Sequence, residues 1–152
     1  MANKSSEEYL MEAKIPLRLS CISTSGWPVV LSLWYLFEEG RIYCATPQQA
    51  KVVTYLMREE RCAFEVASDE PPYCGVRARA RATIDQDRGL EILERLLVRY
   101  LGGVDKPLAK KLLSRSASEV AIQLEPLGYY TWNFTNRMRN SLEGNNQKLC
   151  PE

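Results

Sequence analysis

The sequence contains no histidine among its 152 residues. Histidine is the usual proton shuttle near neutral pH and a very common metal ligand in its neutral form. Its absence excludes Ser-His-Asp and Cys-His catalysis, and it excludes zinc sites built on two histidines. No other residue stands out as a general acid or base, so the sequence identifies no catalytic residue.

The sequence also lacks long apolar runs, C-x-x-C pairs and an excess of either charge. The longest apolar run, residues 29–37, is interrupted by Ser32 and is far shorter than the roughly 20 residues that span a bilayer. The five cysteines form no C-x-x-C pair, so we expect reduced thiols and no metal site. A net charge of +1 gives no bulk attraction to nucleic acid or anionic membrane. With a polar start that resembles no signal peptide, these features predict a soluble, cytoplasmic protein that binds neither nucleic acid nor membrane.

What is present is a mainly β pattern with interspersed helices. Runs rich in β-branched and aromatic residues between turn residues predict strands at 17–23, 29–37, 41–46, 61–67, 73–84, 119–124 and 129–134. We expect the first three to form an antiparallel meander. Capping residues and apolar periodicity predict helices at 6–13, 47–57, 88–101 and 107–114, the third with Leu90, Leu93, Leu97 and Leu101 on one face.

This pattern predicts one antiparallel domain over residues 1–140, followed by a polar tail, 141–152, that we expect to be flexible. Six or more antiparallel strands favour a closed barrel over an open sheet, because closure removes exposed strand edges. The fold class expected from the residues is therefore a mainly β barrel with helices between its hairpins.

The transition from the third strand to the second helix predicts an anion site. The strand ends in Ala45 and Thr46, and Lys51 lies on the first turn of the helix that follows. A helix start carries unpaired backbone N–H groups and the positive end of the helix dipole. A lysine and a threonine hydroxyl beside that start favour a phosphate as the ligand.

The order of motifs between Gly26 and Ala63 resembles the pyridoxamine 5'-phosphate oxidase-like family of flavin-binding split barrels. The sequence reads Gly-Trp-Pro, Val-Val-Leu-Ser-Leu-Trp-Tyr, an acidic glycine turn, Ile-Tyr-Cys-Ala-Thr, a helix with Lys51 and then Arg-Cys-Ala-Phe. Tyr73-Cys-Gly-Val-Arg is similar to the family's next strand. The resemblance covers roughly residues 15–134 and implies an antiparallel FMN-binding split β-barrel.

The resemblance also implies the residues that bind the cofactor. Backbone groups of residues 31–34 would flank the isoalloxazine ring, and residues 45–51 would hold the phosphate. Gln49 and Ala80 depart from the family, which often has a basic or hydroxyl residue at the first position and a glycine at the second. Either the affinity for phosphate is then weaker, or the missing charge comes from Arg77, Arg79 or Arg81. The full set of expected cofactor residues is Leu31, Ser32, Leu33, Trp34, Ala45, Thr46, Gln49, Lys51, Arg77 and Trp132.

The family builds its site between two subunits, so we expect a homodimer in which Trp132 reaches the partner's flavin. The consecutive residues Trp34, Tyr35, Leu36 and Phe37 support a dimer, because alternation along a strand would turn half of them outward. The opposing interpretation is that the helix at 88–101 covers them within one chain.

The resemblance implies an FMN-dependent oxidoreductase that transfers hydride to or from a small-molecule substrate. Three alternatives stay open on the sequence. The fold also accommodates a deazaflavin coenzyme, it serves as a non-catalytic carrier or sensor of flavin or haem, and a barrel of this kind can lose its cofactor. The lack of histidine weakens the haem alternative, because the common axial ligand is missing.

Overall fold

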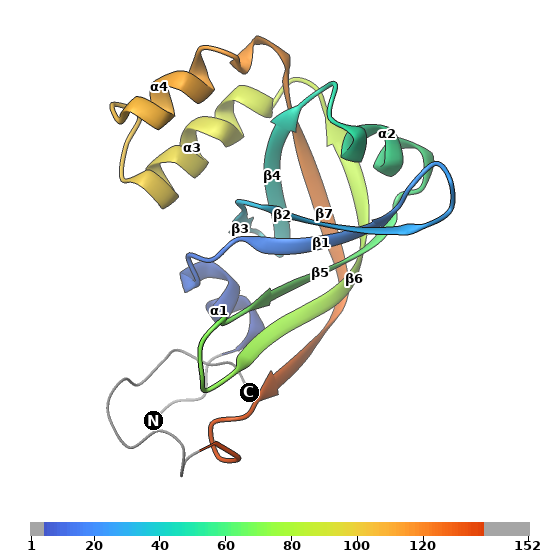
Figure 1. The fold of residues 1–152 in the computed structure, drawn as a ribbon, viewed down its shortest axis with the longest axis vertical. Helices are drawn as coiled ribbons and strands as arrows, with labels where there is room; N and C mark the ends of the chain where they lie inside the picture. The colour runs from blue at the N-terminus through green and yellow to red at the C-terminus, as the bar shows by residue number, and fades with distance from the viewer. Residues whose placement is uncertain (1–4, 139–152) are drawn as a thin grey trace.

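The structure is a computed structural model that describes residues 5–138, and it shows a seven-stranded antiparallel sheet with helices at its ends and on one side (Figure 1). A short 3₁₀ turn, Ser116–Ser118, precedes the last strand. In chain order the elements are α1 (Ser6–Glu12), β1 (Leu17–Ile22), β2 (Pro28–Leu33), β3 (Leu36–Glu38), β4 (Arg41–Pro47), α2 (Lys51–Arg58), β5 (Arg61–Ala67), β6 (Cys74–Asp85), α3 (Gly89–Leu101), α4 (Pro107–Leu113) and β7 (Glu119–Asn133).

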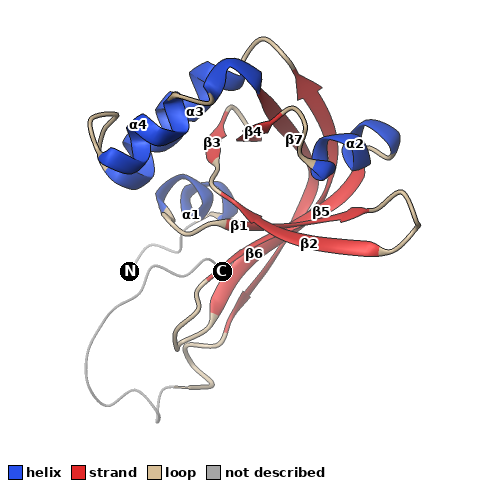
Figure 2. Cartoon of the chain, turned by 45° about the horizontal axis from the view of Figure 1, so that its top comes forward, coloured by secondary structure: helices blue, strands red, loops and turns tan. Residues whose placement is uncertain are grey.

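The sheet has the strand order β2-β1-β5-β6-β7-β4-β3 and curls around a common core (Figure 2). Side chains of β6 alternate strictly between the two faces of the sheet. Its alanines are buried on the core face, and Arg77, Arg79 and Arg81 are exposed on the other face. Helices α1 and α2 contribute Leu10 and Leu56 to the same core. The predicted antiparallel barrel of one domain is confirmed.

The predicted strand at 29–37 is wrong in one respect, because two strands occupy it. β2 pairs with β1, whereas β3 pairs with β4 at the opposite end of the sheet order. Trp34 and Tyr35 carry the chain across this gap, and the buried Tyr35 hydroxyl donates to the Leu10 carbonyl at 2.8 Å. The predicted meander is therefore wrong too, since the two hairpins lie at opposite sheet edges.

The two strands predicted at 119–124 and 129–134 are one continuous strand, β7. β4 pairs with β7 only as far as Leu124. At Pro126, therefore, one edge of β7 has no pairing with β4. A proline without its N–H is tolerated at such an edge. The pairing with β6 shifts register between Ala78 and Ala80, and Gly128 takes a φ of 120° there. A bulge thus replaces the predicted turn.

Helices α3 and α4 lie together outside the barrel, against β4 and the start of β7 (Figure 1). The predicted helix at 88–101 is confirmed to within one residue, and Gly102 ends it with a φ of 78°. Its predicted apolar face is wrong for Leu90, which is exposed, because the buried stripe also contains Ile92 and Leu96. The buried stripe is wider than predicted because α3 packs on β4, on the start of β7 and on α4.

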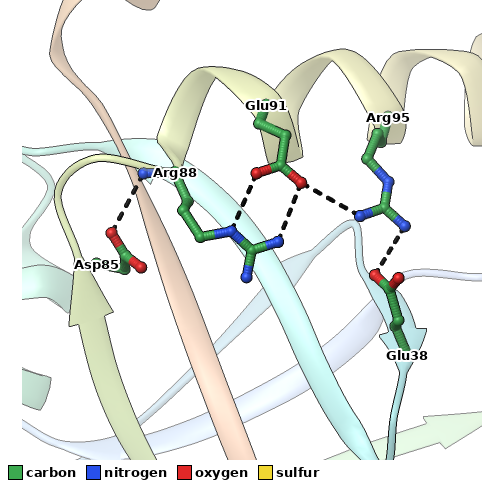
Figure 3. Close-up of polar contacts among 5 residues, drawn as sticks. All are labelled: Glu38, Asp85, Arg88, Glu91 and Arg95. Carbon is green, nitrogen blue, oxygen red and sulfur yellow. Dashed lines mark hydrogen bonds and ion pairs between the residues drawn. The ribbon is translucent and has the colours of Figure 1, made fainter.

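A chain of ion pairs fixes α3 to the end of β3 (Figure 3). Arg88 donates two 3.0 Å hydrogen bonds to Glu91, and Glu91 also pairs with Arg95. Arg95 then reaches Glu38 of β3 at 2.8 Å. The backbone N–H of Arg88 donates to Asp85, the last residue of β6. The contacts hold the helix in register with two strands, although each pair is partly exposed and individually weak.

Three cysteines, Cys21, Cys44 and Cys62, are free and buried in the barrel. Cys74 is disulfide-bonded, so the expectation of a reduced thiol is wrong there. Among residues 5–138 no helix is long and apolar enough to cross a membrane. The predicted tail, 141–152, lies outside the described residues.

Candidate functional site

A cleft of about 370 Å³ lies between the barrel and the outer helices, and we call it the barrel–helix cleft. Strands β2 and β4 form one wall, α3 and α4 form the other, and the start of β7 closes it. Most of its lining is apolar, which is typical of small-molecule sites with a few placed polar groups. The lining residues are Pro16, Ser32, Leu33, Trp34, Ala45, Pro47, Leu93, Leu96, Leu112, Arg115 and Glu119.

Trp34 is held in this cleft by Tyr100, the penultimate residue of α3. The two rings stack at 5.0 Å between centroids and 5° between planes. The Tyr100 hydroxyl accepts from the Tyr35 backbone N–H at 3.3 Å and donates to the Ile15 carbonyl at 3.3 Å. Because Tyr35 follows Trp34 directly, the Tyr100 side chain fixes both the backbone and the Trp34 ring at the crossing between β2 and β3.

Glu119 enters the cleft at the first position of β7, where it pairs in register with Pro47. Gly89 permits this placement, because a Cβ on that residue would lie 2.0 Å from the Glu119 carbonyl oxygen. Burial raises the pKa of the Glu119 carboxyl above its ordinary value. A carboxyl with a raised pKa in an apolar cleft is a typical feature of a functional site.

Lys51 is the first residue of α2 and is exposed, as the anion-site prediction requires. The helix start has no side-chain cap, since its N-cap residue is Ala50. Within residues 5–138 Lys51 forms no ion pair. Thr46 is buried at 7 % exposure, and Gln49 is exposed in the turn before α2. The first turn of α2 thus presents unpaired N–H groups and a lysine without an ion pair. Lys51 is not among the lining residues of the cleft, although Pro47, four residues before it, is.

Arg77 and Trp132 lie far from that helix start within one chain. The Arg77 guanidinium lies 4.4 Å from the centre of the Tyr130 ring and 5.5 Å from that of Trp132. Thr46 pairs with Val120 at the start of β7, whereas Trp132 lies near the end of that strand. Figure 1 shows the end of β7 and helix α2 at opposite ends of the sheet. One chain therefore does not bring these two groups together.

Arg77 lines a second cavity of 710 Å³, which we call the outer groove. It lies on the outer face of the sheet, and none of its lining residues belongs to a helix. Its lining includes three arginines and three aromatic residues, and Val30, Leu127 and Tyr130 are exposed there. The lining is Arg18, Ser20, Val30, Ala63, Phe64, Glu65, Arg77, Ala78, Arg79, Leu127, Gly128, Tyr129 and Tyr130.

The structure thus brings four of the ten expected cofactor residues into one cleft: Ser32, Leu33, Trp34 and Ala45. Leu31 instead packs against the barrel core. The sequence did not indicate Arg115 and Glu119, the two charged residues of the cleft. No local pattern marks them, because α4 and β7 converge on the cleft only through tertiary packing.

The four consecutive residues 34–37 do not form an exposed patch, so that argument for a dimer is wrong. Tyr35 and Leu36 are buried, and Trp34 is half-buried beneath Tyr100. Leu36 packs with residues of α3. The opposing interpretation, in which the helix at 88–101 covers this segment within one chain, is confirmed.

Comparison with solved structures identifies the fold. An F420 reductase superposes with a TM-score of 0.70 at 18 % identity, covering 86 % of this chain and 98 % of that one. A pyridoxamine 5'-phosphate oxidase-like protein of Listeria innocua gives 0.60 at 15 % identity, covering 80 % and 91 %. HutZ, the heme storage protein of Vibrio cholerae, gives 0.64 at 14 % identity, covering 81 % and 89 %. No family model and no curated protein sequence matches the chain.

Proposed function

Because this chain adopts the split-barrel fold of the pyridoxamine 5'-phosphate oxidase-like proteins, we propose that it binds FMN in the barrel–helix cleft and acts as an oxidoreductase. The observation that carries the proposal is the convergence of Ser32, Leu33, Trp34 and Ala45 on one apolar cleft. A bound flavin supplies hydride-transfer chemistry, and the protein binds and orients it against a small substrate.

The residues fit a phosphorylated ring cofactor in two ways. The Trp34 ring, which is held by its stack on Tyr100, gives the cleft a flat aromatic surface, and such faces stack on planar rings. The uncapped start of α2 with Lys51 follows four residues after Pro47, which lines the cleft. Backbone N–H groups and a lysine at a helix start form a phosphate site.

We further propose a homodimer in which the outer groove faces the partner chain. The exposed Val30, Leu127 and Tyr130 form an apolar surface beside arginines, and aromatic residues and arginine are enriched in interfaces. This arrangement would place Arg77 and Trp132 near the partner's cofactor. It accounts for their distance from Lys51 within one chain.

A deazaflavin coenzyme is the second candidate, favoured by the similarity to an F420 reductase. A haem carrier is favoured by the similarity to HutZ, but the chain has no histidine to ligate the iron. The absorption spectrum of the purified protein separates these candidates. Flavin visible bands support FMN, a Soret band supports haem, and a colourless sample that binds only the deazaflavin supports the second candidate.

The phosphate assignment is tested by Lys51→Ala. A charge-assisted contact contributes about 1.5–3 kcal/mol, so FMN affinity is expected to fall about tenfold or more. Titration followed by quenching of flavin fluorescence measures this change. Lys14→Ala, which removes an exposed lysine next to α1, is the matched control and should leave the dissociation constant unchanged. Equal affinity of the Lys51 variant and the unaltered protein would contradict the assignment.

A further inference from the structure

Arg115 is the one cationic side chain among the described residues that line the barrel–helix cleft. Its backbone N–H donates to the Leu112 carbonyl at 3.1 Å. Its guanidinium forms no hydrogen bond or ion pair within residues 5–138. Glu119, the other charged residue of the cleft, does not pair with it. Arg115 is exposed, so its guanidinium is accessible to a ligand that enters the cleft.

The segment that carries Arg115 is joined to the turn before α2. The Gln48 backbone N–H donates to the Ser118 carbonyl at 2.7 Å, and Pro47 pairs in register with Glu119. Arg115 precedes the 3₁₀ turn of residues 116–118. At a rise of about 2 Å per residue, its backbone lies roughly 6 Å from Ser118. A long side chain at that position can extend toward the turn of residues 47–50, which leads into α2 and Lys51.

The phosphate site of the proposed function lacks a second basic residue, because Gln49 occupies the position where one was expected. The three arginines of β6 do not replace it within the chain. Arg81 forms an ion pair with Glu60. Arg77 lies over the rings of Tyr130 and Trp132, and it lines the outer groove together with Arg79.

We propose that Arg115 supplies the second positive charge for the cofactor's phosphate group, acting together with Lys51 at the start of α2. The inference rests on the proposed function and adds a residue to its site. A guanidinium donates two parallel hydrogen bonds to a phosphate, which a glutamine at position 49 does not. The Glu119 carboxylate in the same cleft would repel a phosphate, and the charge of Arg115 offsets that repulsion.

The test compares two ligands that differ only in the phosphate, FMN and riboflavin, on the full chain. Arg115→Gln is expected to weaken FMN binding about tenfold or more and to leave riboflavin binding within about twofold. Lys111→Gln removes an exposed charge from α4 outside the cleft, and it should change neither constant. Arg115→Lys, which keeps the charge, should retain part of the preference for FMN.

Each outcome decides one claim. If Arg115→Gln weakens the binding of both ligands equally, or of neither, the proposed role of Arg115 is overturned. The proposed function stands in that case, because the unaltered chain still binds FMN. If the unaltered chain binds neither FMN nor riboflavin, nor a deazaflavin, the proposed function itself fails. Thermal unfolding of the variants confirms that each is folded at the titration temperature. If Arg115→Gln does not fold, Arg115→Lys alone decides, and an unchanged FMN-to-riboflavin ratio with weaker binding of both overturns the proposal.

Discussion

The protonation of Glu119 depends on the environment of the cleft. Its first position in β7 and the close approach of Gly89 place a carboxyl beside apolar side chains of α3 and α4. Desolvation disfavours the charged form of a carboxyl, which is why its pKa is raised. The sequence marks Glu119 only as the start of a strand, so its chemical environment could not be predicted from local pattern.

The raised pKa of Glu119 predicts a pH dependence of stability. Between the ordinary value of 4.5 and the native pKa, the folded state binds more protons than the unfolded state. The free energy of unfolding therefore falls as pH rises through that window. A glutamine at position 119 does not titrate, so Glu119→Gln lacks this fall in the free energy of unfolding. The stability of the variant relative to the unaltered protein should therefore increase as pH rises from 4 to 8.

Urea denaturation at several pH values measures this difference. The matched control is Glu125→Gln, which removes an exposed carboxyl from the same strand. Its stability difference should not follow the same pH dependence. A Glu119→Gln difference that is constant with pH would contradict the burial of this carboxyl.

At the scale of elements, the sequence predicts best where one local rule governs a segment. The strand Arg61–Ala67 has the predicted bounds, and α3 begins one residue later than predicted and ends at Leu101 as expected. Prediction failed at the break between β2 and β3 and at the bulge in β7. The bulge depends on pairing with β6, and the break depends on contacts of Tyr35 with Leu10 and Tyr100. These partners lie far away in the sequence, so apolar runs alone do not predict either feature.

The crossing between β2 and β3 depends on Tyr100. Its hydroxyl bonds to backbone groups of Tyr35 and Ile15, and each such bond contributes about 1 kcal/mol. Tyr100→Phe keeps the ring stack on Trp34 and should lower the free energy of unfolding by about 1–2 kcal/mol. Tyr73→Phe, on an exposed ring, is the control. If the two variants are equally stable, the hydroxyl does not hold the crossing.

At the scale of the whole molecule, the outer groove is the surface that we propose faces a second copy. Val30 is 67 % exposed there, and a charge at this position would be costly to bury in an interface. We expect Val30→Glu to convert a dimer into a monomer in size-exclusion chromatography with light scattering. Val104→Glu, which is outside the groove and 37 % exposed, should remain dimeric. A monomer in the unaltered protein that still binds FMN would contradict both the dimer and the shared role of Trp132.

The candidate site as a whole was only partly predictable. Residues 32–34 and Ala45, which the resemblance grouped as cofactor residues, lie in one cleft; their role in binding a cofactor stays a prediction. The resemblance did not reveal the second wall of the cleft, since α3 and α4 are positioned by packing and by the ion pairs of Figure 3. The charged residues of the site, Arg115 and Glu119, belong to that unpredicted part.

The central claim is that a phosphorylated flavin occupies the barrel–helix cleft beside Trp34. Replacing Trp27 and Trp132 with phenylalanine leaves Trp34 as the single tryptophan of the chain. Titration of this variant with FMN, followed by Trp34 fluorescence, tests the claim most directly. We expect saturable quenching that reaches completion at one FMN per chain. Trp34 fluorescence that is unchanged by both FMN and a deazaflavin coenzyme would contradict the account.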